Sequence, residues 1–176
     1  MKKFFTSLFL LLVSIALHAE SVEVDELTYN LYSNATASVA ANQSTNLSGE
    51  LSIPATITVN DTAYRVVSIA SSAFVNCTGL TSVTIPKTVK SIGDRAFYGC
   101  KNLTYVSIPS KAQKIGKEAF SGCALKEVHC YITDPKPTGL RAFEGCEKAT
   151  LYVPTGTRKA YHNTVDWWTF RNIIEF

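Results

Sequence analysis

The chain has 176 residues, room for one domain of ordinary size, and its formal net charge at pH 7 is +3. If residues 1–19 are removed, Lys2 and Lys3 leave without any acid, so 15 of the 17 basic residues remain against 14 acidic ones and the net charge falls to +1. A charge this small excludes the strongly basic surface that binds nucleic acid or an anionic membrane.

Residues 1–19 have the features of a secretory signal peptide. Lys2 and Lys3 form a short basic start, and the apolar run from Leu8 to Leu17 is too short to span a membrane. Ala16 and Ala19 are small residues that suit cleavage, and either could mark the site. We therefore expect an exported protein, secreted or at the cell surface, with no membrane span after cleavage.

Residues 20–50 are predicted to form an N-terminal β cap built on a hairpin. Apolar and polar residues alternate roughly in the first part, and residues 33–49 are rich in Asn, Ser, Thr and Ala, which indicates a partner strand with loops. The first repeat begins at Leu51, and residues 55–66 are predicted to be a β-hairpin inserted into it. The Asn60-Asp61 step tolerates the left-handed backbone that such a tight turn needs.

Residues 51–154 carry a repeat of 23 residues. An Ala-Phe pair and a cysteine recur at this spacing, as Ala73-Phe74, Ala96-Phe97, Ala119-Phe120 and Ala142-Phe143, and as Cys77, Cys100, Cys123 and Cys146. A fixed period of this length is typical of stacked units that bury each other's apolar faces. We therefore predict a mainly β fold with short irregular or helical turns, arranged as a solenoid of about five rungs.

Each predicted rung contains one strand and two corners. Val83 and Ile85 are expected to point inward and Ser82 and Thr84 outward, because successive side chains of a strand alternate. A proline after the strand forces one corner. A second corner is expected at a recurring glycine, at Gly93, Gly116 and Gly139.

The four repeated cysteines are expected to be buried thiols. Equivalent residues of neighbouring rungs have parallel Cβ vectors, whereas a disulfide needs Cβ atoms that converge. A small thiol packs as a hydrophobic group in such a core. Cys130, in a strand position that isoleucine holds in other rungs, is expected to behave in the same way.

An irregular loop is expected at residues 131–138, before the last Ala-Phe pair, because this segment contains two prolines. Residues 155–176 are predicted to close the stack as a C-terminal aromatic cap. One or two helical turns are expected between residues 157 and 163. The apolar residues of the segment are Trp167, Trp168, Phe170, Ile173, Ile174 and Phe176. An exposed solenoid end would associate with other chains, which favours a cap, and an aromatic platform for a ligand is the alternative.

The repeated phrase Ile-Gly-x-x-Ala-Phe-x-x-Cys-x-x-Leu-x-x-Val-x-Ile-Pro resembles the BspA-like class of leucine-rich repeats, also called the Treponema pallidum type. The ending resembles that of the family too, with Tyr152-Val153-Pro154 followed by Tyr161, Trp168 and Phe170. The resemblance covers about residues 47–176. It implies a right-handed solenoid, export and surface display, and adhesion to host matrix proteins or other cells. The array is short, and the asparagine ladder of other leucine-rich repeats is absent.

The outward strand positions form the candidate binding face. We expect contact with an extracellular protein or glycan to centre on Tyr105, His129 and Tyr152, which should lie along one line of the sheet and face solvent. The surrounding candidates are Ser82, Thr84, Thr104, Ser107, Thr150, Lys126 and Glu127. Serine and threonine are also ordinary solvent-facing strand residues, which is the alternative interpretation. We expect the protein to be a monomer.

No catalytic, metal-binding or cofactor-binding residues are predicted. His129 and Cys130 are adjacent, so on a strand they should point to opposite faces and cannot act as a nucleophile and its base. The cysteine and histidine spacings of a zinc site are absent. The sequence therefore predicts a non-enzymatic binding module. The alternatives are an enzyme or accessory protein acting on surface glycans, and a purely structural spacer.

Overall fold

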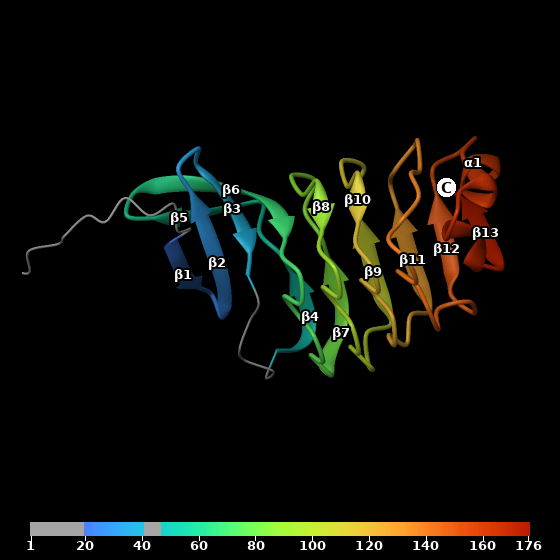
Figure 1. The fold of residues 1–176 in the computed structure, drawn as a ribbon, viewed down its shortest axis with the longest axis horizontal. Coiled ribbons are helices and arrows are strands. Elements are labelled where there is room, and N and C mark those ends of the chain that lie inside the picture. Colours follow the sequence, from blue (N-terminus) through green and yellow to red (C-terminus); the bar gives the residue numbers. More distant parts are fainter. Residues whose placement is uncertain (1–19, 41–46) are drawn as a thin grey trace, which may run out of the picture.

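A computed structural model describes residues 20–40 and 47–176, and Figure 1 shows their strands stacked along the long axis of the molecule. The predicted signal peptide at residues 1–19, and residues 41–46 of the predicted N-terminal cap, lie outside the described residues. The fold is mainly β, as predicted. The boundaries assigned to the two caps stay a prediction.

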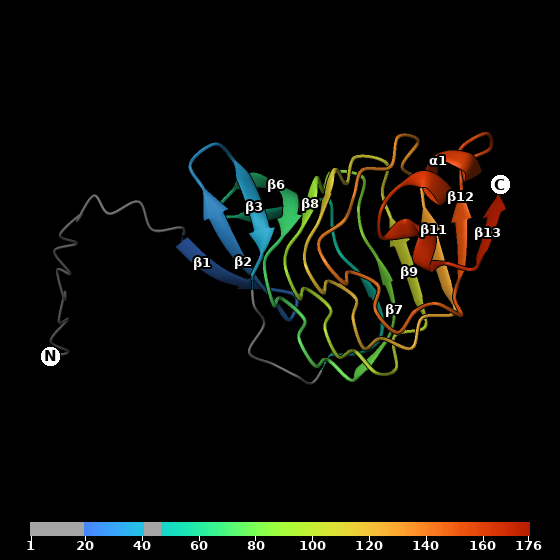
Figure 2. The ribbon, with the colours of Figure 1, turned by 45° about the vertical axis from the view of Figure 1, so that its right-hand side comes forward.

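One face of the molecule is a parallel sheet of six strands in the order β13-β12-β11-β9-β7-β4 (Figure 2). Their bounds are β4 (Ser48–Ser52), β7 (Gly79–Thr84), β9 (Tyr105–Ile108), β11 (Glu127–Cys130), β12 (Thr150–Val153) and β13 (Asn172–Glu175). Each strand pairs with the equivalent strand of the next repeat, so that Val83, Val106 and Val128 lie side by side. Five rungs were predicted. The sixth strand, β13, lies in the segment assigned to the C-terminal cap.

The second sheet has seven strands and joins the N-terminal segment to the repeats. Its strands are β1 (Glu20–Val24), β2 (Leu27–Tyr32), β3 (Thr36–Val39), β5 (Thr56–Val59), β6 (Thr62–Ile69), β8 (Ser91–Ile92) and β10 (Lys114–Ile115). The first three are antiparallel, and β3 pairs with β6 in parallel. β5 and β6 form a hairpin around Asn60 and Asp61, whose φ angles of 48° and 62° are the left-handed backbone that the sequence predicted.

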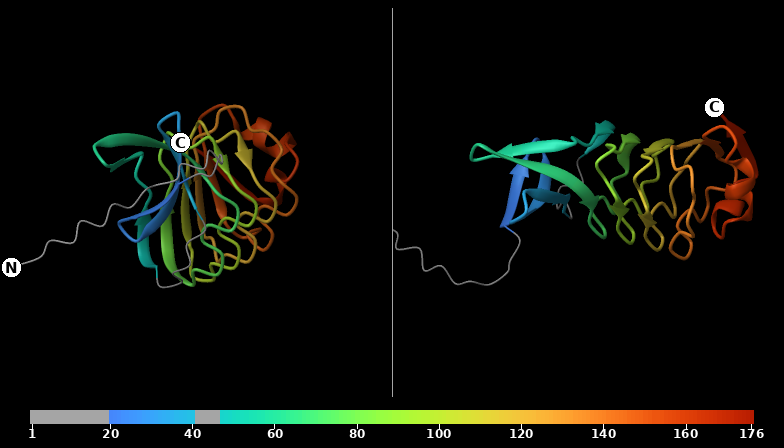
Figure 3. Two further views of the ribbon diagram at one scale, coloured as in Figure 1. Left: turned by 60° about the vertical axis from the view of Figure 1, so that its left-hand side comes forward. Right: turned by 90° about the horizontal axis from the view of Figure 1, so that it is seen from above.

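The core between the sheets is a ladder of stacked phenylalanines, and the rungs follow one another in the right-hand view of Figure 3. Ring centroids are 4.9 Å apart for Phe74 and Phe97, 5.1 Å for Phe97 and Phe120, and 5.3 Å for Phe120 and Phe143. All four rings are buried and nearly parallel. Full burial of a phenylalanine stabilises a fold by about 1.5–3 kcal/mol, so this ladder is a principal source of stability.

The repeated cysteines form a second ladder beside the rings. Cys100 Sγ donates to the Phe74 carbonyl and Cys123 Sγ to the Phe97 carbonyl, each at 3.1 Å. All five cysteines are buried and unpaired, which confirms the predicted thiols. Burial, together with the nearby Glu147 carboxylate, raises the pKa of Cys146 to about 12, so this thiol stays protonated at neutral pH.

The last ring of the ladder is covered by residues near the C-terminus. Trp167, in the short 3-10 helix η1 (Trp167–Thr169), has its ring centroid 5.1 Å from that of Phe143, and its indole N–H donates to the Lys136 carbonyl at 2.9 Å. Phe170 packs edge-on against the same ring. Trp168 was predicted to belong to this apolar cluster and is instead 68% exposed, because adjacent side chains of so short a helix point in different directions.

The recurring glycines allow close approach of rungs, which differs from the permissive corner predicted for them. Gly93, Gly116 and Gly139 do not have positive φ angles. A Cβ atom on Gly116 would lie 2.5 Å from the backbone nitrogen of Asp94 in the preceding rung. The left-handed positions lie elsewhere in the rung, for example at Gly145, where φ is 87° and nothing lies within 4 Å of an added Cβ.

Gly116→Ala should therefore destabilise the protein more than Gly145→Ala. The first change forces two backbones apart and should cost about 3 kcal/mol, the upper part of the usual range for overpacking. The second meets only the backbone penalty of a left-handed residue, about 1 kcal/mol. Urea denaturation followed by circular dichroism measures both free energies. Equal costs would show that close rung contact is not the reason for glycine at position 116.

Candidate binding face of the parallel sheet

The strand register places the outward side chains of the six-stranded sheet in two columns. Pairing aligns Ser82 with Tyr105 and Tyr105 with Glu127 in one column. It aligns His129 with Ser107 on one side and with Tyr152 on the other in the second column. Because the repeat sets the register, each column samples one position of the 23-residue unit across successive rungs.

Five aromatic side chains gather at the C-terminal half of this face, and we name them the aromatic strip: Tyr105, His129, Tyr131, Tyr152 and Phe176. The ring centroid of His129 is 4.4 Å from that of Tyr152 and 5.2 Å from that of Tyr105. The ring of Phe176 lies 6.3 Å from His129 and meets Tyr131 edge-on at 5.3 Å. His129 is therefore the centre of a continuous aromatic surface.

The structure brings together the three residues on which the sequence analysis centred the face, with two differences. Tyr105 lies one column away from His129 and Tyr152, so the line across the sheet bends diagonally at Tyr105. The three side chains are half-buried, although they were expected to be solvent-facing. The reason is that each ring packs against the ring of the next rung.

The other predicted residues surround the strip unevenly. Thr84 is exposed, and Ser82 and Ser107 are half-buried beside it. The Thr104 hydroxyl donates to the Thr81 carbonyl at 3.2 Å, and the Thr150 hydroxyl accepts from the Asn172 amide at 3.0 Å, so both are engaged within the sheet.

The two predicted charged residues flank the strip. Lys126 is exposed just before β11. The Glu127 carboxylate lies 3.3 Å from His129 Nε2. The pKa of the Tyr105 phenol is raised, mainly by burial and further by Tyr131 and Glu127, while the hydrogen bond from Ser107 opposes the shift. Tyr105 therefore stays a neutral hydrogen-bonding group.

Sequence reasoning missed two members of the strip. Tyr131 was assigned to the irregular loop and Phe176 to the cap, yet they are 42% and 51% exposed on the outer face. Tyr131 follows His129 by two residues, and Phe176 follows Ile174 by two, so the alternation of strand side chains could have placed both on this face. The prolines after Tyr131 and the apolar composition of the end segment concealed that signal.

The geometry around His129 does not support catalysis by the adjacent cysteine. Cys130 points into the core, where its Sγ lies 3.1 Å from the Tyr161 hydroxyl, and burial raises its thiol pKa to about 11. Within residues 20–40 and 47–176, no cluster of histidine, cysteine and acidic side chains could hold a metal ion. In the same described part, no helix has the length and apolarity to cross a membrane.

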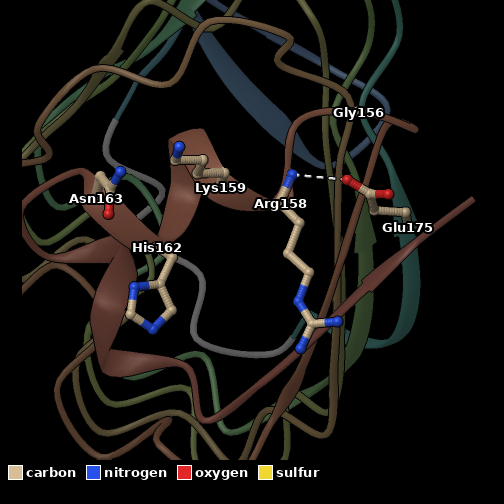
Figure 4. Close-up of a pocket in the computed structure, with 6 residues that line it drawn as sticks. All are labelled: Gly156, Arg158, Lys159, His162, Asn163 and Glu175. Atoms are coloured by element: carbon tan, nitrogen blue, oxygen red, sulfur yellow. Dashed lines mark hydrogen bonds between the residues drawn. The ribbon is translucent and has the colours of Figure 1, made fainter.

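A hollow of about 450 Å³ lies beside helix α1 (Arg158–Asn163) at the C-terminal end (Figure 4). Arg158, Lys159 and His162 line it together with Glu175 of β13. The Arg158 backbone N–H donates to Glu175 Oε1 at 2.8 Å. Backbone N–H groups, that of Arg158 first, hold the pKa of the Glu175 carboxyl below its ordinary value.

Comparison with known proteins identifies the repeat. The sequence profile of the BspA type leucine rich repeat region matches residues 67–165 in six copies. Among curated proteins, none matches the chain.

Several solved structures share the fold. A leucine-rich repeat protein from Bacteroides ovatus is 30% identical, with a TM-score of 0.66 over 87% of this chain and 40% of its own. The pneumococcal vaccine antigen PcpA is 22% identical, with a TM-score of 0.64 over 81% of this chain and 40% of its own. A leucine rich repeat protein of T. pallidum is 21% identical, with a TM-score of 0.63 over 89% of this chain and 64% of its own. The chain thus spans less than two thirds of each of these proteins.

Glu175→Gln should remove part of the acid sensitivity of the fold. A carboxyl whose pKa is lowered by folding stabilises the protein above its unfolded value of about 4.3, and this contribution is lost as pH falls through the folded value. The melting temperature of the variant should therefore fall less between pH 6 and pH 3 than that of the native chain. Glu50→Gln, at an exposed position of β4, is the control. An identical decline in the native chain and Glu175→Gln would contradict the role of this carboxylate.

Proposed function

The chain belongs to the BspA-type leucine-rich-repeat family, and on that premise we propose that it is a non-catalytic binding module which engages an extracellular protein or glycan through the aromatic strip. The observation that carries the proposal is the gathering of five aromatic rings on an outer sheet face whose neighbouring positions are mostly serine and threonine. Large, rigid aromatic side chains provide most of the binding energy in protein interfaces.

The exposed members of the strip support a contact surface over a purely structural role. Tyr131, Ile174 and Phe176 are each more than two fifths exposed and lie next to one another at the C-terminal edge of the sheet. Their rings and side chains are not needed to cover the phenylalanine ladder, which lies on the opposite side of the strands. Contiguous exposed apolar area of this kind marks interaction sites.

The ring arrangement favours a protein ligand. His129 and Tyr152 are stacked at 4.4 Å with 26° between their planes, so each covers a face of the other. Flat sugar rings bind by covering an aromatic face, whereas in this pair one face of each ring is already covered by the other ring. A phenol and an imidazole suit hydrogen bonds and packing with protein side chains and backbone.

Export to the cell surface is part of the same proposal. It rests on the predicted signal peptide at residues 1–19 and on the family. One structural neighbour is described as a leucine rich cell surface protein and another as a vaccine antigen.

The test is a Tyr105→Ser/Tyr152→Ser double variant, assayed for binding to immobilised extracellular matrix proteins and to a glycan array. Each lost anchor should weaken binding by about 1–2 kcal/mol, roughly tenfold or more. Because few charges surround the strip, binding should depend weakly on salt. Stability should fall by only about 1 kcal/mol per lost ring contact.

Tyr98→Ser is the control, because Tyr98 is a surface tyrosine, 38% exposed, whose ring contacts the Arg95 guanidinium and none of the rings of the strip. A ligand bound equally well by the native chain and a folded double variant would remove the aromatic strip from consideration.

A further inference from the structure

A row of three shallow hollows crosses the C-terminal end of the molecule, and we name it the end-cap groove. The first, of about 450 Å³, lies beside α1 (Figure 4). The second, of about 250 Å³, shares His162 and Asn163 with the first, and the third, of about 210 Å³, shares Trp168 with the second. The shared residues place the three hollows in series on one surface.

The first end of the groove is basic. Arg158 and Lys159 project from α1, and Figure 4 shows Arg158 on the side of Glu175 and Lys159 nearer to Asn163. In the part of the chain that the structure describes, neither forms an ion pair through its side chain. The Glu175 carboxylate in the same hollow accepts the Arg158 backbone N–H at 2.8 Å and keeps its charge, so two cations and one carboxylate line this end and the excess charge is positive.

The middle of the groove is apolar and exposed. Trp168 is 68% exposed and Val165 is 59% exposed, and both line the second hollow. The turn before η1 produces this arrangement: Asp166 has a φ of 71°, after which Trp167 points into the core and Trp168 points outward. Trp167 and Phe170 already cover the phenylalanine ladder, so Trp168 is not required for that purpose.

The other end of the groove is acidic. Three carboxylates and one cation line the third hollow together with Trp168: Glu144, Glu147, Asp166 and Arg141. Among the described residues, neither Glu147 nor Asp166 forms an ion pair, and the Glu147 carboxylate accepts the Gly145 backbone N–H at 3.0 Å. Glu144 also lies there, but its carboxylate is engaged by Arg141 at 3.8 Å and by the Ser121 hydroxyl at 3.3 Å. Leu140 adds a further apolar side chain, 64% exposed.

A surface with one basic end, one acidic end and an apolar middle is complementary to itself. Rotation by 180° about an axis through the middle places the basic end of one copy over the acidic end of the other, and the same contact is made twice. Two cations on α1 then meet two carboxylates, none of which forms an ion pair among the described residues, while Trp168 and Val165 lose their exposure to water. The exposed apolar side chains in the middle and the opposite charges at the two ends both favour a second copy of this chain as the partner.

In place of the monomer expected from the sequence, we propose that two copies of this chain associate tail to tail through the end-cap groove. Trp168 lies near the two-fold axis, and Arg158 and Lys159 of each copy lie beside Glu147 and Asp166 of the other. The contact is small, so the dimer is weak and reversible. It joins two aromatic strips in one particle, and a pair of strips gains avidity for a repetitive ligand.

The experiment is sedimentation velocity of the whole chain over a range of micromolar concentrations at low salt. The native chain should self-associate, and the association should weaken at high salt because exposed charges are screened. Trp168→Ser should weaken it at least tenfold, as truncation of a central aromatic anchor does. Circular dichroism should show each variant folded, since the altered side chains lie on the surface.

Charge reversal tests the geometry directly. The Arg158→Glu/Lys159→Glu variant has two acidic ends. The Glu147→Lys/Asp166→Asn variant has two basic ends. Asparagine is chosen at position 166 because it tolerates the left-handed backbone there. Each variant alone should associate at least tenfold more weakly than the native chain. An equimolar mixture should form a heterodimer. Lys87→Glu/Lys90→Glu, at exposed positions far from the groove, is the control and should associate like the native chain.

Three outcomes would overturn the proposal. A native chain that stays monomeric at all concentrations would leave the groove to a different protein or to none. Association that survives Trp168→Ser would place the contact elsewhere, for example at the free edges of β4 and β13. Variants of opposite charge that fail to associate when mixed would contradict the two-fold arrangement. None of these outcomes bears on the aromatic strip, which the tyrosine variants test separately.

Discussion

The structure depends on the stacking of each rung on its equivalent in the next repeat. Phe74, Phe97, Phe120 and Phe143 lie 4.9–5.3 Å apart in a buried ladder, and thiols beside them donate to the carbonyl of the preceding rung. One rung has no core of its own, because its apolar side chains are covered only by neighbouring rungs. Rung spacing must therefore stay close, which explains a glycine such as Gly116 where a Cβ would strike the rung before it.

The same stacking determines what the outer face can do. A repeat that aligns inward phenylalanines also aligns outward positions, so His129 meets Tyr152, which lies 23 residues later in sequence. Tyr105 reaches His129 diagonally from the neighbouring column. Because rings on adjacent strands pack against one another, the strip is half-buried and held in place before any ligand arrives. A preorganised surface of this kind loses little side-chain entropy on binding.

The sequence predicts those features that the 23-residue period controls, and fails where the period ends. The phenylalanine ladder, the unpaired cysteines and the Asn60-Asp61 turn follow from residue type and spacing. The different fates of Trp167 and Trp168 arise in a short 3-10 helix, after the left-handed residue Asp166, that has no counterpart in the repeat. Phe176 joins the aromatic strip only because β13 continues the sheet, and an apolar end segment could equally have folded inward.

The most direct test of this account is the free energy of unfolding of a Phe120→Ala variant, measured by urea denaturation with circular dichroism. Phe120 lies between two other rings of the ladder, so its loss should cost about 3–5 kcal/mol, a large part of the 5–15 kcal/mol that typically stabilises a domain. The free energy of unfolding should fall by an amount in that range, and both sheets should unfold in one transition. A variant within about 1 kcal/mol of the native chain would contradict this account, because the rungs would then be held together by something other than the phenylalanine ladder.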